Sequence, residues 1–241
     1  MRFLLLLLLA LPWAASGQDL RVLSGGAAKS LVDPLAASFP GGKVEVQYQP
    51  MGKLTESLAQ GAKVDLVVVT EEVVPRLERE GRVKRGAKPI ARVGIGVAVN
   101  EKAPLPDISS VEAFKQTLLA AKSIVYIDPK VGTSGKHVAE VLSRLGIADP
   151  VNAKARLGQG GYIVEPVGRG EIELGIHQIS EILPVKGVKL VGELPRELQK
   201  YTVYVAVPVT DSRPVLDLIA HLTGPEARKR LAQAGYTAPG E

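Results

Sequence analysis

The fold follows from one stretch near the start of the chain, LRVLSGGAAKSLVDPLAASF, which spans residues 20–39. A short β-type run comes first, the turn Ser24-Gly25-Gly26 follows, and apolar side chains then recur at helical spacing. Pro34 falls within the helical part and removes a backbone donor there, so we expect a kink or a late helix start. The stretch predicts a strand, a glycine turn and a helix, in that order.

The same unit recurs along the chain. Residues 44–48 and 64–69 are typical of strands, and helical patterns follow them at 54–58 and 71–80. Further on, a strand at 123–127, a glycine-containing loop at 128–135 and a helix at 136–145 repeat the order. Strands and helices that alternate in this way predict an α/β fold, with a parallel or mixed sheet covered by helices on both faces.

Two long extended runs, at 90–99 and 201–207, are predicted to connect the two blocks of the chain. Between them we expect helices at 111–121, 162–167 and near Glu181, and strands at 174–176 and 188–191. Two helices, at 214–222 and 225–234, end the chain, each with a proline at or near its start, where proline is tolerated.

The first 17 residues, MRFLLLLLLALPWAASG, have the pattern of a secretory signal peptide: one arginine, an apolar run and small residues at the end. The run is much shorter than the roughly 20 residues that span a bilayer. The chain has no cysteine, which excludes disulfides, thiol chemistry and a lipid-modified N-terminal cysteine. We therefore expect cleavage after Gly17 and a soluble periplasmic protein.

Composition and motifs argue against several kinds of partner and bound group. The net charge is +5 with no long run of either sign, which argues against a nucleic-acid partner. The only histidines, His137, His177 and His221, are far apart in sequence and have no clustered carboxylates, so no metal site is expected. No cofactor motif is present: Gly132-Thr133-Ser134-Gly135-Lys136 lacks the spacing of a phosphate-binding Walker loop. We expect a monomer without a cofactor.

Three glycine turns precede predicted helices, at 24–26, 132–136 and 158–162. A helix start directs free N–H groups and a positive dipole end toward whatever lies in front of it, which suits an anion. Each turn has a plainer interpretation as a helix-capping or corner turn. Together, in two blocks, they fit a ligand held between two lobes.

An enzyme is a less favoured interpretation. No Gly-x-Ser-x-Gly motif occurs, and no order of serine, histidine and aspartate around Ser134 matches a hydrolase. His177 follows a predicted strand end, where α/β proteins bind ligands, and would be the base of a secreted enzyme that uses the same cleft. The absence of a paired nucleophile argues against this, and we expect no catalytic activity.

The chain resembles the molybdate-type periplasmic solute-binding proteins of ABC importers over nearly all of the mature sequence. The resemblance lies in the order and spacing of loose motifs, which are Ser24-Gly25-Gly26-Ala27, residues 62–68, Asp128-Pro129 with Thr133-Ser134-Gly135, Gly168-Arg169-Gly170-Glu171 before Leu174-Gly175-Ile176, residues 222–227, and Ala234-Gly235-Tyr236.

The resemblance implies a two-lobed periplasmic-binding-protein fold of type II, with two crossing hinge strands and a small oxyanion in the cleft. The crossings would lie near 93–99 and 202–207. From the two long extended runs we expect lobe 1 to comprise 18–95 plus 206–241, and lobe 2 to comprise 96–205. The implied partners are a small anionic ligand and an ABC permease at the inner membrane. A scavenger or sensor that works without a transporter is an alternative that the sequence does not separate from this one.

By position, the resemblance implies ligand contacts at Ala27, Met51 or Gly52, Ser134, Gly160 and Gln178. Molybdate binders typically have serine hydroxyls at the first two places and a tyrosine at the last. These differences predict weak molybdate binding and favour another anion, such as a carboxylate, which suits the planar amide of Gln178. Lys53, Lys136 or His177 would balance its charge. The full predicted ligand-binding set is Gly25, Gly26, Ala27, Met51, Gly52, Lys53, Thr133, Ser134, Gly135, Gly160, Gly161, His177 and Gln178.

Overall fold

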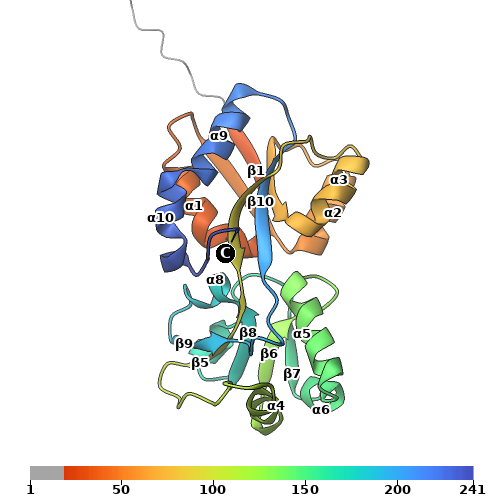
Figure 1. Cartoon of the computed structure of the whole chain (residues 1–241), viewed down its shortest axis with the longest axis vertical. Helices are drawn as coiled ribbons and strands as arrows, with labels where there is room; N and C mark the ends of the chain where they lie inside the picture. The colour runs from red at the N-terminus through yellow and green to blue at the C-terminus, as the bar shows by residue number, and fades with distance from the viewer. Residues whose placement is uncertain (1–18, 241) are drawn as a thin grey trace, which may run out of the picture.

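The computed structural model describes residues 19–240, so the expected signal peptide at 1–17 lies outside the described residues. Two five-stranded sheets form two lobes that are stacked along the long axis of the molecule (Figure 1). The predicted α/β class is confirmed. Within residues 19–240, no helix is both long and apolar enough to cross a membrane.

The sheet of the first lobe has the order β2-β1-β3-β10-β4. Strand β1 is parallel to its neighbours β2 and β3, whereas β10 is antiparallel to its neighbours β3 and β4. The strands are β1 (Leu20–Gly25), β2 (Val44–Gln49), β3 (Leu66–Thr70), β4 (Lys88–Val93) and β10 (Thr202–Pro208). Every residue of β3 is buried, as expected for a strand covered on both faces.

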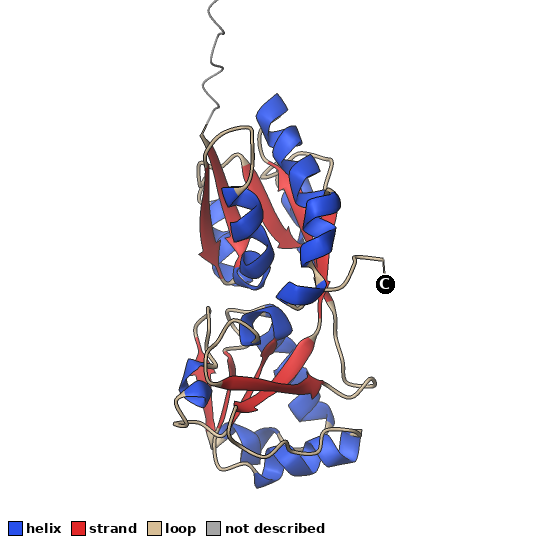
Figure 2. Cartoon of the chain, turned by 90° about the vertical axis from the view of Figure 1, so that its left-hand side faces the viewer, coloured by secondary structure: helices blue, strands red, loops and turns tan. Residues whose placement is uncertain are grey.

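Helices cover both faces of this sheet (Figure 2). They are η1 (Gly26–Ala28), α1 (Lys29–Ala37), α2 (Met51–Ala59), η2 (Glu71–Val73), α3 (Val74–Arg79), α9 (Arg213–Thr223), α10 (Pro225–Arg230) and η3 (Ala232–Ala234). The buried residues of α1 follow the predicted stripe, with Leu31 and Leu35 fully covered. The α-helix begins at Lys29, well before Pro34, so the late start does not occur.

The sheet of the second lobe has the order β7-β6-β8-β5-β9. Its strands are β5 (Ile95–Asn100), β6 (Ile124–Ile127), β7 (Ala155–Gly158), β8 (Leu174–Gln178) and β9 (Val188–Glu193). Its helices are α4 (Val111–Ala120), α5 (Thr133–Arg144), α6 (Ala148–Asn152), α7 (Glu165–Gly168) and α8 (Ile179–Ile182). β7 and α6 were not expected from the sequence, because both are short and β7 is largely exposed.

The two lobes are joined by two crossings. The expected single run at 90–99 is two strands, β4 and β5, which meet at Gly94 and belong to different sheets. The return crossing is the segment 194–201, and β10 then pairs with β3 and β4 of the first lobe. Residues 202–205, which we expected in lobe 2, therefore lie in the first sheet. Alternation along a strand shows that it is extended but not which sheet it joins.

Helix α5 begins at Thr133, three residues before the predicted start at Lys136. Gly132 is the extended residue in front of the helix, so Thr133 and Ser134 belong to the first turn. Gly135 has a packing role: a Cβ there would lie 2.1 Å from the carbonyl oxygen of Ile127, so only glycine lets α5 lie this close to β6. The early start carries the hydroxyl of Ser134 to the space between the lobes.

Candidate binding site between the lobes

A cavity of about 240 Å³ lies between the lobes and is lined by residues of both. Most of the predicted set lines it, namely Gly25, Gly26, Ala27, Met51, Thr133, Ser134, Gly160, Gly161, His177 and Gln178. The starts of three segments face it: the η1 turn with α1, helix α2 and helix α5. The first N–H groups of a helix have no acceptor within that helix, so these starts offer donors to a ligand.

Three predicted residues do not line the cavity. The N–H of Gly52 donates to the carbonyl of Val131 at 3.3 Å, so this donor is already used. Gly135 is buried against β6. Lys53 is exposed, and so is Lys136, which means that neither lysine supplies the expected charge from inside the cavity.

The glycines at the cavity are explained by close contacts. A Cβ at Gly25 would lie 2.8 Å from Cε1 of Tyr204 and 2.9 Å from Cε of Met51. Gly160 has φ +128°, and a Cβ there would lie 2.6 Å from Cγ of Pro50 in the other lobe. Glycine at position 160 therefore lets the lobes meet at the edge of the cavity.

The sequence analysis missed several polar residues that line the cavity. From the first lobe these are Lys29, Tyr48, Gln49 and Tyr204, and from the second lobe they are Tyr162 and Glu181. Tyr48 and Gln49 end the parallel strand β2, so the rule that ligands bind beyond the carboxyl ends of such strands was the available signal for them. Tyr204 comes from β10, a strand whose place in the sheet the sequence does not reveal.

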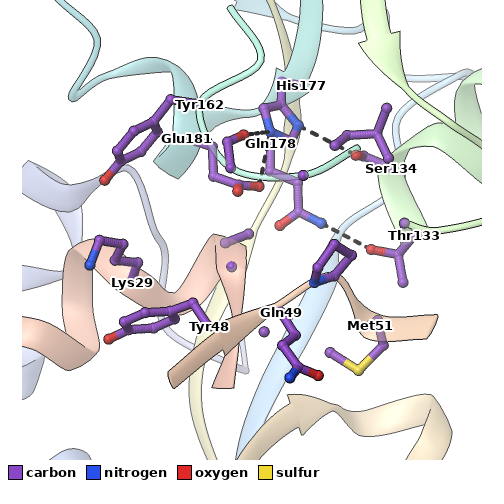
Figure 3. Close-up of a pocket in the computed structure, with 18 of the residues that line it drawn as sticks. Lys29, Tyr48, Gln49, Met51, Thr133, Ser134, Tyr162, His177, Gln178 and Glu181 are labelled. Carbon is purple, nitrogen blue, oxygen red and sulfur yellow. Dashed lines mark hydrogen bonds and ion pairs between the residues drawn. The ribbon is translucent and has the colours of Figure 1, made fainter. Parts of the chain in front are cut away.

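Lys29 is the lysine at the cavity, and it is already paired. Its Nζ lies 2.5 Å from Oδ2 of Asp33 and 4.4 Å from the centre of the Tyr48 ring. The Tyr48 hydroxyl donates to Oδ1 of Asp33 at 2.6 Å. Burial and the neighbouring Asp33 carboxylate raise the pKa of Tyr48, so it stays a neutral hydroxyl. Figure 3 shows Lys29, Tyr48 and Tyr162 gathered on one side of the cavity.

His177 and Glu181 form a buried ion pair at the cavity wall. His177 Nε2 lies 3.1 Å from Glu181 Oε2 and 3.1 Å from the carbonyl oxygen of Gly161, while Nδ1 lies 3.5 Å from Ser134 Oγ (Figure 3). Burial alone would lower the pKa of His177, but the Glu181 carboxylate and the Gly161 carbonyl outweigh it and the pKa is raised. The structure thus places a serine beside His177, a pairing that the sequence did not reveal.

Gln178 follows His177 in β8 and also lines the cavity. Its Nε2 donates to Thr133 Oγ1 at 3.3 Å and to Thr202 Oγ1 at 3.5 Å. Its Oε1 is buried without a hydrogen-bond partner in the part of the chain that the structure describes. The amide therefore links helix α5 of the second lobe to strand β10 of the first.

The other two histidines are structural. His137 Nε2 lies 2.7 Å from the carbonyl oxygen of Leu198, on the return crossing, and His221 Nε2 lies 3.0 Å from that of Leu35. Neither lines the cavity. Within residues 19–240, no group of three or more histidine, aspartate or glutamate side chains is placed to hold a metal ion.

Comparison with known proteins agrees with the fold. The family described as "Bacterial extracellular solute-binding protein" matches residues 20–237. The chain belongs to this family. It is 31% identical to an aconitate isomerase of Pseudomonas sp, over 90% of this chain and 86% of the relative.

The chain is also 25% identical to the molybdate-binding protein ModA of Azotobacter vinelandii, with 92% of this chain and 91% of the relative covered. The solved structure of an Azotobacter vinelandii periplasmic molybdate-binding protein superposes with a TM-score of 0.77 at 18% identity, covering 91% of this chain and 99% of that one. The predicted resemblance to molybdate-type solute-binding proteins is confirmed.

Proposed function

We propose that this solute-binding protein captures a small organic carboxylate in the cavity between its lobes and delivers it to an ABC permease. The observation that carries the proposal is the mixed character of the wall. Helix starts and the hydroxyls of Thr133 and Ser134 offer donors to a carboxylate, while Ala27 and Met51 offer apolar surface. An organic acid has a carbon skeleton that fits such surface, whereas an inorganic oxyanion has none.

The similar proteins support this choice. The name of the Pseudomonas relative, aconitate isomerase, refers to an unsaturated tricarboxylate. The name of the Azotobacter relative refers to molybdate, but identity to it is lower. The family is extracellular by description, and the N-terminal pattern supports our proposal of export to the periplasm through a cleavable signal peptide.

Calorimetric titration of the mature protein tests the ligand class. The panel contains molybdate, tungstate and sulfate beside di- and tricarboxylates such as succinate, tricarballylate and cis-aconitate. We expect at least one carboxylate to bind clearly more tightly than any of the three oxyanions. A thermal-shift scan adds a second readout, because ligand at 100 times its dissociation constant stabilises the protein by about 2.7 kcal/mol. Submicromolar molybdate binding with no carboxylate binding would overturn the proposal.

Isomerisation of an aconitate-like substrate is the second candidate function. One observation favours it: Glu181, an ionisable carboxyl group, lines a cavity that is otherwise suited to an anion. The test is to incubate the mature protein with cis-aconitate and to follow the trans isomer by chromatography. Binding without conversion would leave the protein as a binding protein alone.

A further inference from the structure

Glu181 occupies a position that is hard to explain in a site that only binds an anion. The residue is 6% exposed and lines the cavity. Its Oε2 faces His177, whereas its Oε1 has no hydrogen-bond partner within residues 19–240. That oxygen would lie 3.1 Å from a Cβ placed on Gly26, in the turn at the start of the first helix. The second carboxylate oxygen thus lies beside the glycine turn at the start of the first helix, at the cavity.

The ion pair with His177 accounts for Oε2 of the carboxylate but not for Oε1. His177 Nε2 already has an acceptor in the carbonyl oxygen of Gly161, at 3.1 Å. Burying a carboxylate has a large desolvation cost, and a negative charge repels an anionic ligand. A glutamine would occupy the same space without the negative charge, although it would lose the ion pair with His177. Buried carboxyl groups that face a ligand cavity are the typical acids and bases of enzymes.

We propose that Glu181 is a catalytic base that moves a proton between two carbons of an unsaturated di- or tricarboxylate, a role that rests on the carboxylate ligand proposed above. Oε1 takes a proton from the CH₂ carbon that lies between a carboxylate and the C=C bond. The C–H electron pair forms a new C=C bond, and the former double-bond pair moves to the far carbon. That carbon takes the proton back from Glu181. The product is an isomer, so no oxidant, reductant or co-reactant is needed.

The neighbouring groups fit this reaction. His177 is a positioning residue, because it holds Oε2 and leaves Oε1 directed at the ligand. The negative charge that develops on the substrate carboxylate would lie near the start of α5, where backbone N–H groups and the Ser134 hydroxyl offer donors. Donors that are fixed before the reaction stabilise such a charge without reorganisation. Figure 3 shows Glu181 and Ser134 on the two sides of His177.

The test compares binding with turnover in Glu181→Gln. The probe is cis-aconitate, with calorimetry for affinity and ¹H NMR in D₂O for isomerisation and for exchange of the CH₂ protons. We expect the variant to bind at least as tightly as the wild type, because a negative charge is removed, while isomerisation and exchange fall by at least 100-fold. The matched control is Glu101→Gln, an exposed glutamate that does not line the cavity, and it should behave as wild type.

Glu181→Asp separates the chemical role of residue 181 from its role in folding. It keeps the carboxylate but shortens its reach, so this variant should retain part of the CH₂ proton exchange that Glu181→Gln loses. Exchange by the wild type also serves as a readout that needs no variant. Wild-type binding without isomerisation or proton exchange would overturn the catalytic role and leave the binding function intact. Equal turnover by wild type and Glu181→Gln would overturn it as well. Absence of carboxylate binding by the wild type would instead overturn the proposed function, and this role with it.

Discussion

The N–H of Gly52 donates to the carbonyl of Val131 at 3.3 Å, and this hydrogen bond connects the start of α2 in one lobe with the loop before α5 in the other. Beside it, Pro50 lies against Gly160. The lobes are therefore in direct contact at this edge of the cavity.

This geometry predicts hinged motion about Gly94 and the segment 194–201. Without ligand, the lobes should separate for part of the time, because two short contacts hold this edge. A bound carboxylate should favour the closed arrangement, since it contacts both lobes. Small-angle scattering of the mature protein should show a smaller radius of gyration at ligand saturation. An unchanged radius with a ligand that calorimetry shows to be bound would contradict the motion.

Gly160→Ala should weaken ligand binding by at least tenfold, because the new Cβ would meet Cγ of Pro50 at 2.6 Å and hold the lobes apart. Pro50→Ala removes Cγ and Cδ of the proline. When it is combined with Gly160→Ala, the double variant should regain part of the affinity. Calorimetry on the two single variants and the double variant gives the coupling directly. Gly170→Ala is the control, since Gly170 also has a positive φ but has nothing within 4 Å of a Cβ. Strictly additive effects at 50 and 160 would rule out the contact as the cause.

Ser134→Ala should reduce carboxylate affinity. The hydroxyl lies at the cavity, and a hydrogen bond to a charged group contributes about 1.5–3 kcal/mol, which corresponds to roughly ten- to a hundredfold in affinity. Ser143→Ala, on the exposed side of the same helix, is the matched control for any effect on α5 itself. If both variants bind the ligand as the wild type does, the Ser134 hydroxyl does not contact it.

The His177–Glu181 pair predicts a defined pH dependence of stability. Because the pKa of His177 is raised in the folded protein, its stabilisation is fully present below its ordinary value of 6.5 and is lost as the pH rises through the folded pKa. The wild type should therefore exceed His177→Gln in free energy of unfolding by more at pH 5.5 than at pH 9. Urea titrations at these two values measure it. A difference that grows with pH would contradict the raised pKa.

The leader predicts a processed protein. We expect the chain purified from the periplasm to begin just after Gly17, because the apolar run is too short to span a bilayer and no cysteine can accept a lipid. N-terminal sequencing or intact mass measurement determines the start. A periplasmic form that still begins with Met1 would show that the leader is not cleaved.

Much of the site could be predicted because glycine turns before helices are local features. The turn at Gly25 and Gly26 and the residues Thr133 and Ser134 are recognisable from neighbouring residues alone, and the structure places all four at the cavity. Lys53 was misplaced for the same reason. Proximity in sequence to a loop does not indicate on which side of a helix a side chain lies, and Lys53 is exposed.

The sequence by itself determined the α/β class, the rhythm of strands and helices and the resemblance to solute-binding proteins, because these depend on periodicity and on short motifs. Only the tertiary structure decided that the run at 90–99 belongs to two sheets and that Ser134, His177 and Glu181 meet. His177 and Glu181 are neighbours along the chain, but Ser134 reaches them only because β6 and β8 pair side by side. Pairing between distant strands is set by the whole packed sheet, and no local pattern specifies it.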